Sequence, residues 1–255
     1  MERREGANCA CAPQSECKKM IEFTSYASGS GGNLYTIEDG ETKLLLEAGL
    51  PWKKVRQLLN FRTHEIDGCL STHLHGDHSK SIADVMKAGI PTYANAEVFE
   101  HYGLLDHHRA NVIKPKEQFK INTFAIMPFD VDHDVPNLGL LFCNKEGERF
   151  AYITDGPYSK YRFNDLVGVA IEINFDKQTL KQNLRRGVID SFLYQRLLRT
   201  HLGLDTAVEF FKAQDLSKLR EVHILHCSQQ NANIERIKKA IQGVCGVPTY
   251  IAGGE

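Results

Sequence analysis

The segment HLHGDH at residues 73–78 constrains this chain more than any other, because it places three histidines and one aspartate within six residues. It directly follows residues 67–72, a short run that we expect to form a strand. Neutral imidazole and carboxylate are the usual ligands of Zn, Mn and Fe, and a loop at a strand end presents its side chains to one common space. The segment therefore predicts a metal site, and a fold that brings further ligands to this loop from other elements.

Three more candidate ligands occur later in the chain, each after an apolar segment that we expect to be a strand. They are His133 after residues 123–129, Asp155 after residues 150–154 and His226 after residues 222–225. Because α/β sheets place their sites at strand ends, we expect these side chains to join the HLHGDH segment.

The remaining pattern predicts strands and helices in alternation, typical of a mixed α/β layered fold. Strands are expected near residues 21–27, 34–38, 43–47, 67–72, 91–94, 123–130, 138–143, 149–154, 167–173 and 221–226, with a short strand at the end of the chain. Helices are expected near residues 51–60, 79–89, from about 96, in the charged stretch before 199, and near 205–214 and 231–242. The candidate ligands extend over most of this length, which predicts one domain over residues 20–255.

Composition narrows the class of protein. The chain has 255 residues with 31 Lys and Arg against 32 Asp and Glu, a net charge of −1. This balance excludes a globally basic nucleic-acid binder, but it leaves room for a local basic groove. No run of about 18 apolar residues occurs, so we expect no membrane span.

Residues 1–19 contain no apolar segment of the kind found in a secretory signal. We therefore expect a cytoplasmic protein with free thiols. Cys9, Cys11 and Cys17 cluster in this segment without the regular spacing or fourth ligand of a zinc site. We interpret residues 1–19 as a mobile N-terminal extension, or as sequence upstream of a second start at Met20.

Together these features resemble the metallo-β-lactamase fold superfamily of hydrolases, in which an acidic residue closes an early strand, an HxHxDH loop follows, and His, Asp and His end later strands. The resemblance implies an α/β fold built as a four-layer αββα sandwich. It also implies an active enzyme with two divalent ions per chain, Zn or Mn. By resemblance, the first ion is bound by His73, His75 and His133, the second by Asp77, His78 and His226, with Asp155 bridging and Glu47 orienting a ligand histidine from behind.

The resemblance is closer to one branch of that superfamily, the WalJ/YycJ-like proteins, which look like DNA exonucleases. The shared segments are SYASGSGGNLY, LLLEAGL, THLHGDHSKS, AYITDG, VAIEINFD, RTHLG and HCSQQNAN, within residues 21–235. Two features depart from the pattern: Glu47 stands where Asp is usual, and RTHLG lacks the Ser-Asn that usually follows its His-Leu. The branch implies a phosphodiesterase, most simply a DNA exonuclease of repair or recombination that acts on single-stranded or recessed ends.

A two-metal site of this kind implies a mechanism for phosphodiester cleavage. By resemblance, two bound ions would make a hydroxide available at neutral pH and stabilise its in-line attack on phosphorus. Asp77 would orient that hydroxide or carry a proton. His201, in the THLG segment outside the ligand set, is our candidate for protonating the leaving oxygen, with an ordinary structural histidine as the alternative.

Residues 177–200 carry a local excess of positive charge. Asp190 alone opposes six cationic side chains, which are Lys177, Lys181, Arg185, Arg186, Arg196 and Arg199. Phe192 and Tyr194 lie among them, and a basic groove with aromatic rings holds single strands without reading their sequence. The four arginines are therefore candidate substrate contacts. A solvated amphipathic helix explains the same pattern, and both interpretations hold if they describe different faces.

Two other segments supply candidate substrate contacts. The Gly/Ser loop SGSGGN at residues 28–33 offers backbone N–H groups and polar side chains to a phosphate, which singles out Ser30 and Asn33. A tight turn between strands explains the loop equally well. Asn174, in the EINFD segment, is a further candidate near the site.

Other functions are compatible with the same chemistry. A small cyclic nucleotide or another phosphodiester is the main alternative substrate. Hydrolysis of a thioester, β-lactam or lactone fits the fold, but the basic segment argues against it. A non-catalytic metal-binding partner in a repair complex is disfavoured by the complete ligand set. A homodimer is compatible with the sequence, because twofold dimers are the commonest oligomers.

Overall fold

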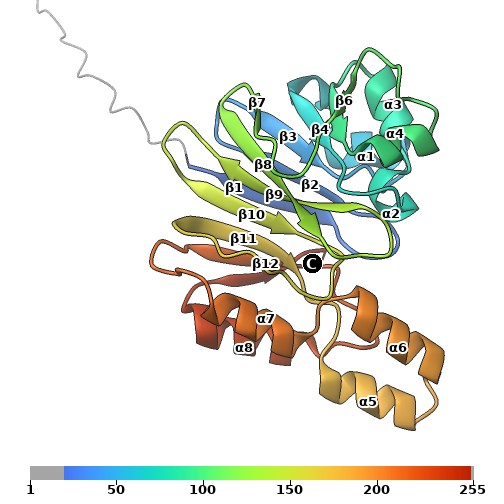
Figure 1. The fold of residues 1–255 in the computed structure, drawn as a ribbon, viewed down its shortest axis with the longest axis vertical. Helices are drawn as coiled ribbons and strands as arrows, with labels where there is room; N and C mark the ends of the chain where they lie inside the picture. Colours follow the sequence, from blue (N-terminus) through green and yellow to red (C-terminus); the bar gives the residue numbers. More distant parts are fainter. Residues whose placement is uncertain (1–19, 254–255) are drawn as a thin grey trace, which may run out of the picture.

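The computed structural model describes residues 20–253 (Figure 1). The predicted N-terminal extension, residues 1–19 with its three cysteines, lies outside the described residues. Within residues 20–253, no helix is both long and apolar enough to cross a membrane.

Two mixed sheets, one of six strands and one of seven, form the centre of the described chain. The first sheet follows chain order, with β1 (Glu22–Ala27), β2 (Leu34–Glu38), β3 (Lys43–Leu46), β4 (Gly68–Leu70), β5 (Thr92–Ala94) and β6 (Ala110–Val112). The second runs in the order β13 (Thr249–Ile251), β12 (Glu221–Leu225), β11 (Leu166–Glu172), β10 (Arg149–Ile153), β9 (Asn137–Cys143), β8 (Phe124–Val131) and β7 (Phe119–Ile121). In each sheet a run of parallel strands, β3 to β6 and β10 to β13, brings several carboxyl ends to one edge.

Helices cover the outer faces of the two sheets (Figure 1). Beside the first sheet lie α1 (Trp52–Leu58), the 3-10 turn η1 (Thr63–Glu65), α2 (Gly76–Ser79), α3 (Ile82–Lys87) and α4 (Ala96–His101). Beside the second lie α7 (Leu204–Lys212) and α8 (Ile234–Cys245), while α5 (Lys177–Arg185) and α6 (Ser191–Thr200) extend outward next to them. The predicted four-layer αββα sandwich is confirmed.

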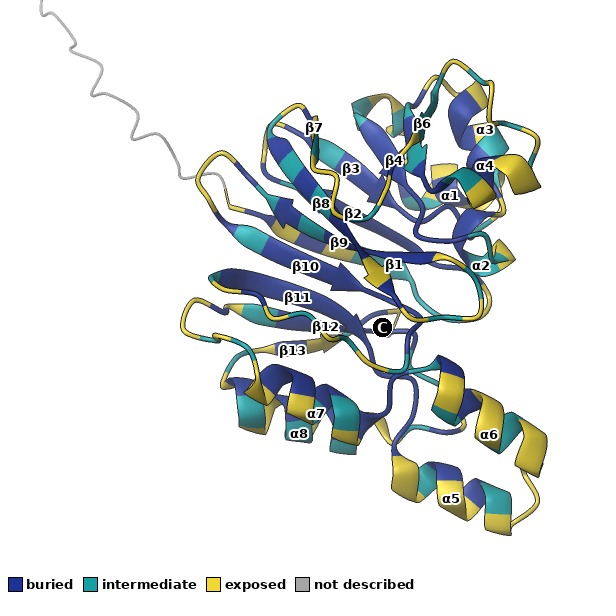
Figure 2. Cartoon of the chain, viewed as in Figure 1, coloured by how far each residue is buried: buried dark blue, intermediate teal, exposed yellow. Residues whose placement is uncertain are grey.

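Central strands are buried on both faces. Successive side chains of a strand point to opposite sides, and each side packs against another layer. In β10, Phe150 and Tyr152 pack between the two sheets, whereas Ala151 and Ile153 pack in the cluster that includes side chains of α7 and α8. Figure 2 shows that most strand residues are buried, whereas the helices are exposed on their outer sides. The strand ends that carry the candidate ligands are therefore anchored in a continuous core.

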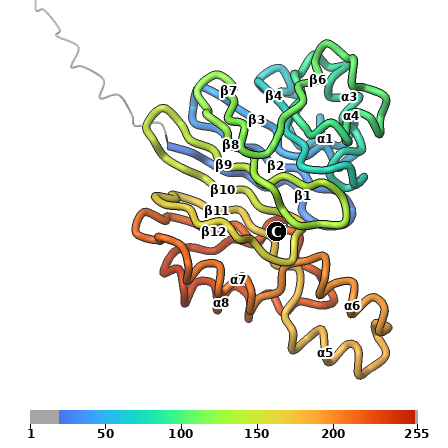
Figure 3. Tube along the Cα trace, in the orientation of Figure 1, coloured from blue at the N-terminus to red at the C-terminus, as the bar shows by residue number. Residues whose placement is uncertain are grey.

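The observed elements differ from the predicted ones at three places. The helix predicted near residues 79–89 is present as the shorter α3, but the preceding α2, which begins inside the HLHGDH segment, was not predicted. The charged stretch contains two helices, α5 and α6, which form an outlying hairpin (Figure 3). The edge strands β6 and β7 were not predicted, because they are short and only one of their six side chains is buried, so neither forms an apolar run.

Candidate metal centre

The candidate ligands lie at strand ends of both sheets. The HLHGDH segment follows β4, Asp155 follows β10 and His226 follows β12, while Glu47 follows β3. Glu47, Asp155 and His226 have left-handed backbones, with φ of 66°, 49° and 49°. This conformation costs a non-glycine residue about 1–3 kcal/mol and clusters at functional sites. Three such residues at one edge indicate that the surrounding structure stabilises this unfavourable backbone and thereby fixes the orientation of their side chains.

The first group of ligands consists of His73, His75 and His133, whose ring nitrogens converge. Nε2 of His73 lies 3.1 Å from Nδ1 of His75, and Nε2 of His133 lies 3.3 Å from that same Nδ1. Nitrogens bound to a tetrahedral zinc ion at about 2.0–2.1 Å lie about 3.3–3.4 Å from one another. The three nitrogens are therefore spaced as ligands of one ion would be.

The second group, Asp77, His78, Asp155 and His226, adjoins the first. Oδ2 of Asp155 is 2.7 Å from Nε2 of His78 and 3.5 Å from Nε2 of His73, so this carboxylate faces both groups. Oδ2 of Asp77 is 3.5 Å from Nε2 of His226 and 3.6 Å from Nε2 of His78. The structure thus brings all seven predicted metal ligands together at one place.

Unpaired polar atoms at this centre fit a bound cation. Oδ1 of Asp155 and Nε2 of His226 are buried and have no hydrogen-bond partner. Leaving a buried polar group unsatisfied costs about 1–3 kcal/mol, a cost that a cation bound by these residues would remove. The donor set of imidazole nitrogens and carboxylate oxygens suits divalent transition metals. These residues are therefore consistent with a metal site.

The charges in the second group depend on one another. Burial alone would raise the pKa of Asp155, but His78 and His226 hold that pKa well below its usual range. Burial alone would lower the pKa of His226, but the nearby carboxylates of Asp155 and Asp77 raise it to about 10. Metal binding needs the unprotonated ring, so an ion must displace this proton. The affinity of the site for metal therefore falls as the pH falls.

Glu47 lies behind the second group and is fully buried. Its Oε1 accepts hydrogen bonds from the hydroxyls of Thr72 at 2.8 Å and Tyr152 at 3.1 Å. The same oxygen lies 3.3 Å from Nδ1 of His78, which leaves Nε2 of that ring facing Asp155. A carboxylate in this position fixes the orientation of a ligand histidine, and the two hydroxyls hold the longer side chain of Glu in place.

Glu172, at the end of β11, was not singled out from the sequence. Its Oε1 lies 2.5 Å from Nδ1 of His201 and 3.2 Å from Nδ1 of His226. Burial alone would lower the pKa of His201, but the charge of Glu172 and its hydrogen bond raise it above the usual value. A carboxylate that ends an apolar strand was the available signal, because the same signal identified Asp155.

Two of the predicted substrate contacts have inward positions. Asn33 is fully buried, and its Nδ2 donates to the carbonyl of Asp77 at 3.1 Å. The same Nδ2 lies 3.0 Å from Nε2 of His78. The assignment of Asn33 to the substrate is therefore corrected: it braces the loop that carries two candidate ligands. Asn174 is also buried and donates to the carbonyl of His226 at 3.0 Å.

The other predicted substrate contacts differ in whether they line the cavity at the candidate ligands. Arg196 and Ser30 line a cavity of about 350 Å³, the metal cavity, together with Asp77, Asp155 and His201. Arg185, Arg186 and Arg199 do not line it and are exposed on or next to α5 and α6. Only Arg196 of the four arginines thus faces the candidate ligands.

Known proteins share this sequence pattern and fold. Residues 42–224 match the family model described as Beta-lactamase superfamily domain. The chain is 28% identical over 233 residues to exodeoxyribonuclease WalJ of Streptococcus pneumoniae, covering 85% of each chain. It is 25% identical over 239 residues to exodeoxyribonuclease YycJ of Bacillus anthracis, covering 88% of this chain and 89% of that one. The solved structure of the metallo-beta-lactamase fold protein YhfI from Bacillus subtilis superposes with a TM-score of 0.71 at 16% identity, covering 92% and 98% of the two chains.

The family match extends over more than two thirds of the chain, from β3 to β12. The two sheets between helical layers and the clustered histidines and aspartates agree with it. The chain therefore belongs to the metallo-beta-lactamase superfamily of hydrolases.

Proposed function

We propose that the chain is a dinuclear-metal-dependent phosphodiesterase, and that it acts as a DNA exonuclease on single-stranded or recessed ends. The observation that carries this proposal is Arg196, which places a cation from the basic stretch in the metal cavity beside Asp77 and His201. The similarity to exodeoxyribonucleases over most of the chain supports the choice of DNA.

In this proposal the first group of three histidines would hold one ion, and Asp77, His78, Asp155 and His226 would hold the second, with Asp155 also facing the first group. When bound, the ions lower the pKa of water and offset the negative charge that develops on phosphate oxygens. The chain supplies the alignment: Glu47 fixes the ring of His78, and Asn33 fixes the backbone of Asp77.

Proton transfer would be divided between two side chains. Asp77 is part of the wall of the metal cavity, so its carboxylate is placed to orient the attacking water or accept its proton. His201 lines the same cavity, and the charge of Glu172 raises its pKa, which favours the protonated ring. It therefore donates a proton to the leaving oxygen, while Glu172 holds its ring from the far side.

The proposal is tested with pure protein loaded with Mn or Zn. Single-stranded DNA labelled at its 5′ or 3′ end, and cyclic mononucleotides in parallel, are incubated with wild type and with Asp77→Ala. We expect stepwise loss of nucleotides from DNA, and a rate at least about 100-fold lower in the variant. Asp84→Ala, at an exposed carboxylate on α3, is the matched control and keeps full activity. Intact DNA together with an opened cyclic nucleotide would contradict the exonuclease proposal.

A further inference from the structure

The metal cavity lies between two larger cavities. On one side is a cavity of about 730 Å³, the side cavity, which shares His133 and Asp134 with the metal cavity. On the other side is a cavity of about 560 Å³, the polar cavity, which shares Ser30, Arg196 and His201 with it. A substrate bound at the metal ligands can therefore extend in two directions.

The two flanking cavities differ in charge. The polar cavity is lined by Arg196 and by amide, hydroxyl and imidazole groups, and no carboxylate is among its described lining residues. The side cavity carries four carboxylates against two lysines, namely Glu97, Asp130, Asp132 and Asp134 against Lys114 and Lys160. Because phosphates are attracted by Arg and repelled by carboxylates, a polynucleotide backbone is favoured in the polar cavity and disfavoured in the side cavity.

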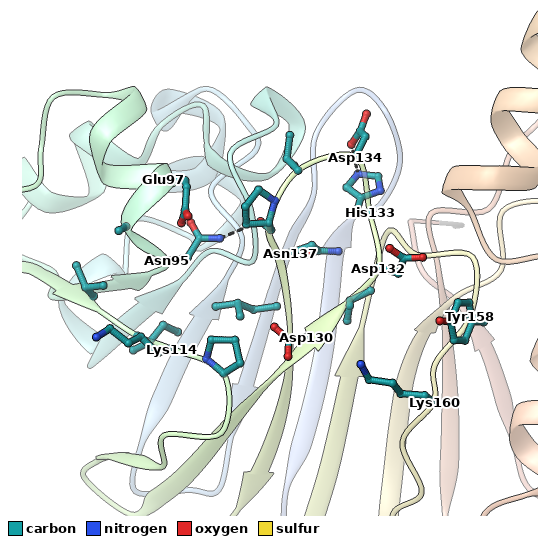
Figure 4. A pocket seen from close by; sticks show the side chains of 18 residues that line it. Asn95, Glu97, Lys114, Asp130, Asp132, His133, Asp134, Asn137, Tyr158 and Lys160 are labelled. Carbon is teal, nitrogen blue, oxygen red and sulfur yellow. Dashed lines mark hydrogen bonds and ion pairs between the residues drawn. The ribbon is translucent and has the colours of Figure 1, made fainter.

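The walls of the side cavity suit a flat, uncharged group that carries hydrogen-bond donors. Figure 4 shows Asp130 in the middle of the cavity, with Tyr158 and Lys160 on one wall and Asn95 and Lys114 on the other. Tyr158 is 50% exposed, so its ring is available for stacking. A carboxylate accepts hydrogen bonds from the exocyclic amino groups of nucleobases.

We infer that the side cavity receives the nucleoside at the end of the substrate strand, while the rest of the strand leaves through the polar cavity. This inference rests on the proposed function. It explains the preference for strand ends by electrostatic repulsion, because a strand that continued past the metal ligands would place its next phosphates among the carboxylates of the side cavity. One nucleoside, which brings no further phosphate, meets no such repulsion.

The test compares DNA with a natural terminal base and DNA with an abasic terminal residue at the end that the enzyme attacks. Stacking of one base makes the natural end about tenfold better in kcat/KM for wild type. Tyr158→Ala removes the ring, and Val112→Trp, at an exposed position of the cavity lining, fills the space. We expect both variants to lower the ratio of the two kcat/KM values toward one. Tyr250→Ala, which removes a ring 49% exposed on β13, is the matched control and keeps the ratio.

Binding of adenosine to the metal-free protein, measured by saturation-transfer-difference NMR, gives a readout without catalysis. We expect a signal for wild type and Tyr250→Ala, and its loss in Val112→Trp. A ratio near one in wild type, or adenosine binding that Val112→Trp leaves intact, would overturn the inference. Hydrolysis of bis(p-nitrophenyl) phosphate by wild type separately reports the metal centre. If that diester and DNA both stay intact, the proposed function fails and this inference falls with it.

Discussion

The metal centre and the hairpin of α5 and α6 both carry residues that the sequence marked as functional. Most of these residues are buried at the centre but exposed in the hairpin. At the centre, His73, His78 and Asp155 are buried, and each is contacted by residues from distant parts of the chain. In the hairpin, the arginines are exposed and Phe192 is 77% exposed. The hairpin has a small apolar cluster of its own, which includes Leu180, Ile189 and Leu197.

Under the proposed function, the two regions would have different tasks. Metal ligands must stay within a few tenths of an ångström of one geometry, and a site anchored in two sheets meets that demand. A surface that holds a flexible strand through phosphates tolerates movement, because charge acts over about 10 Å at ordinary ionic strength. Substitutions at the centre should therefore abolish function, whereas substitutions in the hairpin should reduce affinity or local stability.

The largest effect is expected for Asp155→Ala, because this carboxylate faces both ligand groups. We expect loss of bound metal, measured by mass spectrometry of the metals, and a fall of more than about 100-fold in phosphodiester hydrolysis. Asp84→Ala is the control for loss of an exposed carboxylate. A folded Asp155→Ala variant with full metal content and activity would show that the two groups do not share this ligand.

The next prediction tests the role of His201 as a proton donor separately from the role of the metal ligands. Glu172→Gln removes the negative charge that raises the pKa of His201, so we expect kcat on DNA to fall about 100-fold. Hydrolysis of bis(p-nitrophenyl) phosphate should change little, because p-nitrophenolate leaves without a proton. Glu221→Gln is a matched control, since Glu221 lies 3.3 Å from His223 away from the centre. An equal loss on both substrates would assign Glu172 to the support of His226 instead.

A smaller effect is expected on stability, at the two aspartates that begin the hairpin helices. The Asp176 carboxylate accepts from the backbone N–H groups of Thr179 at 2.9 Å and Asn233 at 2.7 Å, and it pairs with Arg236. Asp190 accepts from one, that of Leu193, at 2.7 Å. Asp176→Ala should lower the free energy of unfolding by about 2 kcal/mol and Asp190→Ala by about 0.5–1 kcal/mol. Urea unfolding measures both values, and equal values would contradict the stronger attachment that the additional partners of Asp176 predict.

The pH dependence of the same carboxylate sharpens this prediction. Burial alone would raise the pKa of Asp176, but the N–H groups of Thr179 and Asn233 and the charge of Arg236 lower it. Its stabilising contribution is therefore present above the unfolded-state pKa of about 3.9 and is lost as the pH falls through the lower folded-state value. The stability difference between wild type and Asp176→Asn should shrink in acid, and a constant difference down to that range would contradict the assignment.

The smallest effects distinguish the arginines. Arg196→Gln removes the one arginine in the metal cavity, so KM for single-stranded DNA should rise roughly tenfold. Arg185→Gln, on the exposed side of α5, should raise KM only roughly twofold. It should lower the slope of log binding constant against log salt concentration by less than about 0.7, the value for one phosphate contact to a single strand. Fluorescence anisotropy over a series of salt concentrations measures the difference, and equal effects would remove the distinction between the arginine that lines the metal cavity and the one that does not.

Much of the centre was predictable because its signal is local. The HLHGDH segment and the residues that follow β10 and β12 are marked by residue type and by position after an apolar run, and such runs report burial directly. Glu172 carries the same mark and was available to this reasoning. The separate helices α5 and α6 were not predicted, although Gly187, with φ of 69°, and the N-cap Asp190 mark the break between them.

The sequence by itself determined the chemistry of this protein: the ligand types, the family fold and the local excess of positive charge. Only the tertiary structure decided which side chains face inward and which face a substrate. Asn33 and Ser30 share one loop, yet Asn33 braces Asp77 from the interior while Ser30 lines the metal cavity. The physical reason is that burial depends on packing between segments distant in the chain, such as the two sheets that meet at this edge, and no local pattern records those contacts.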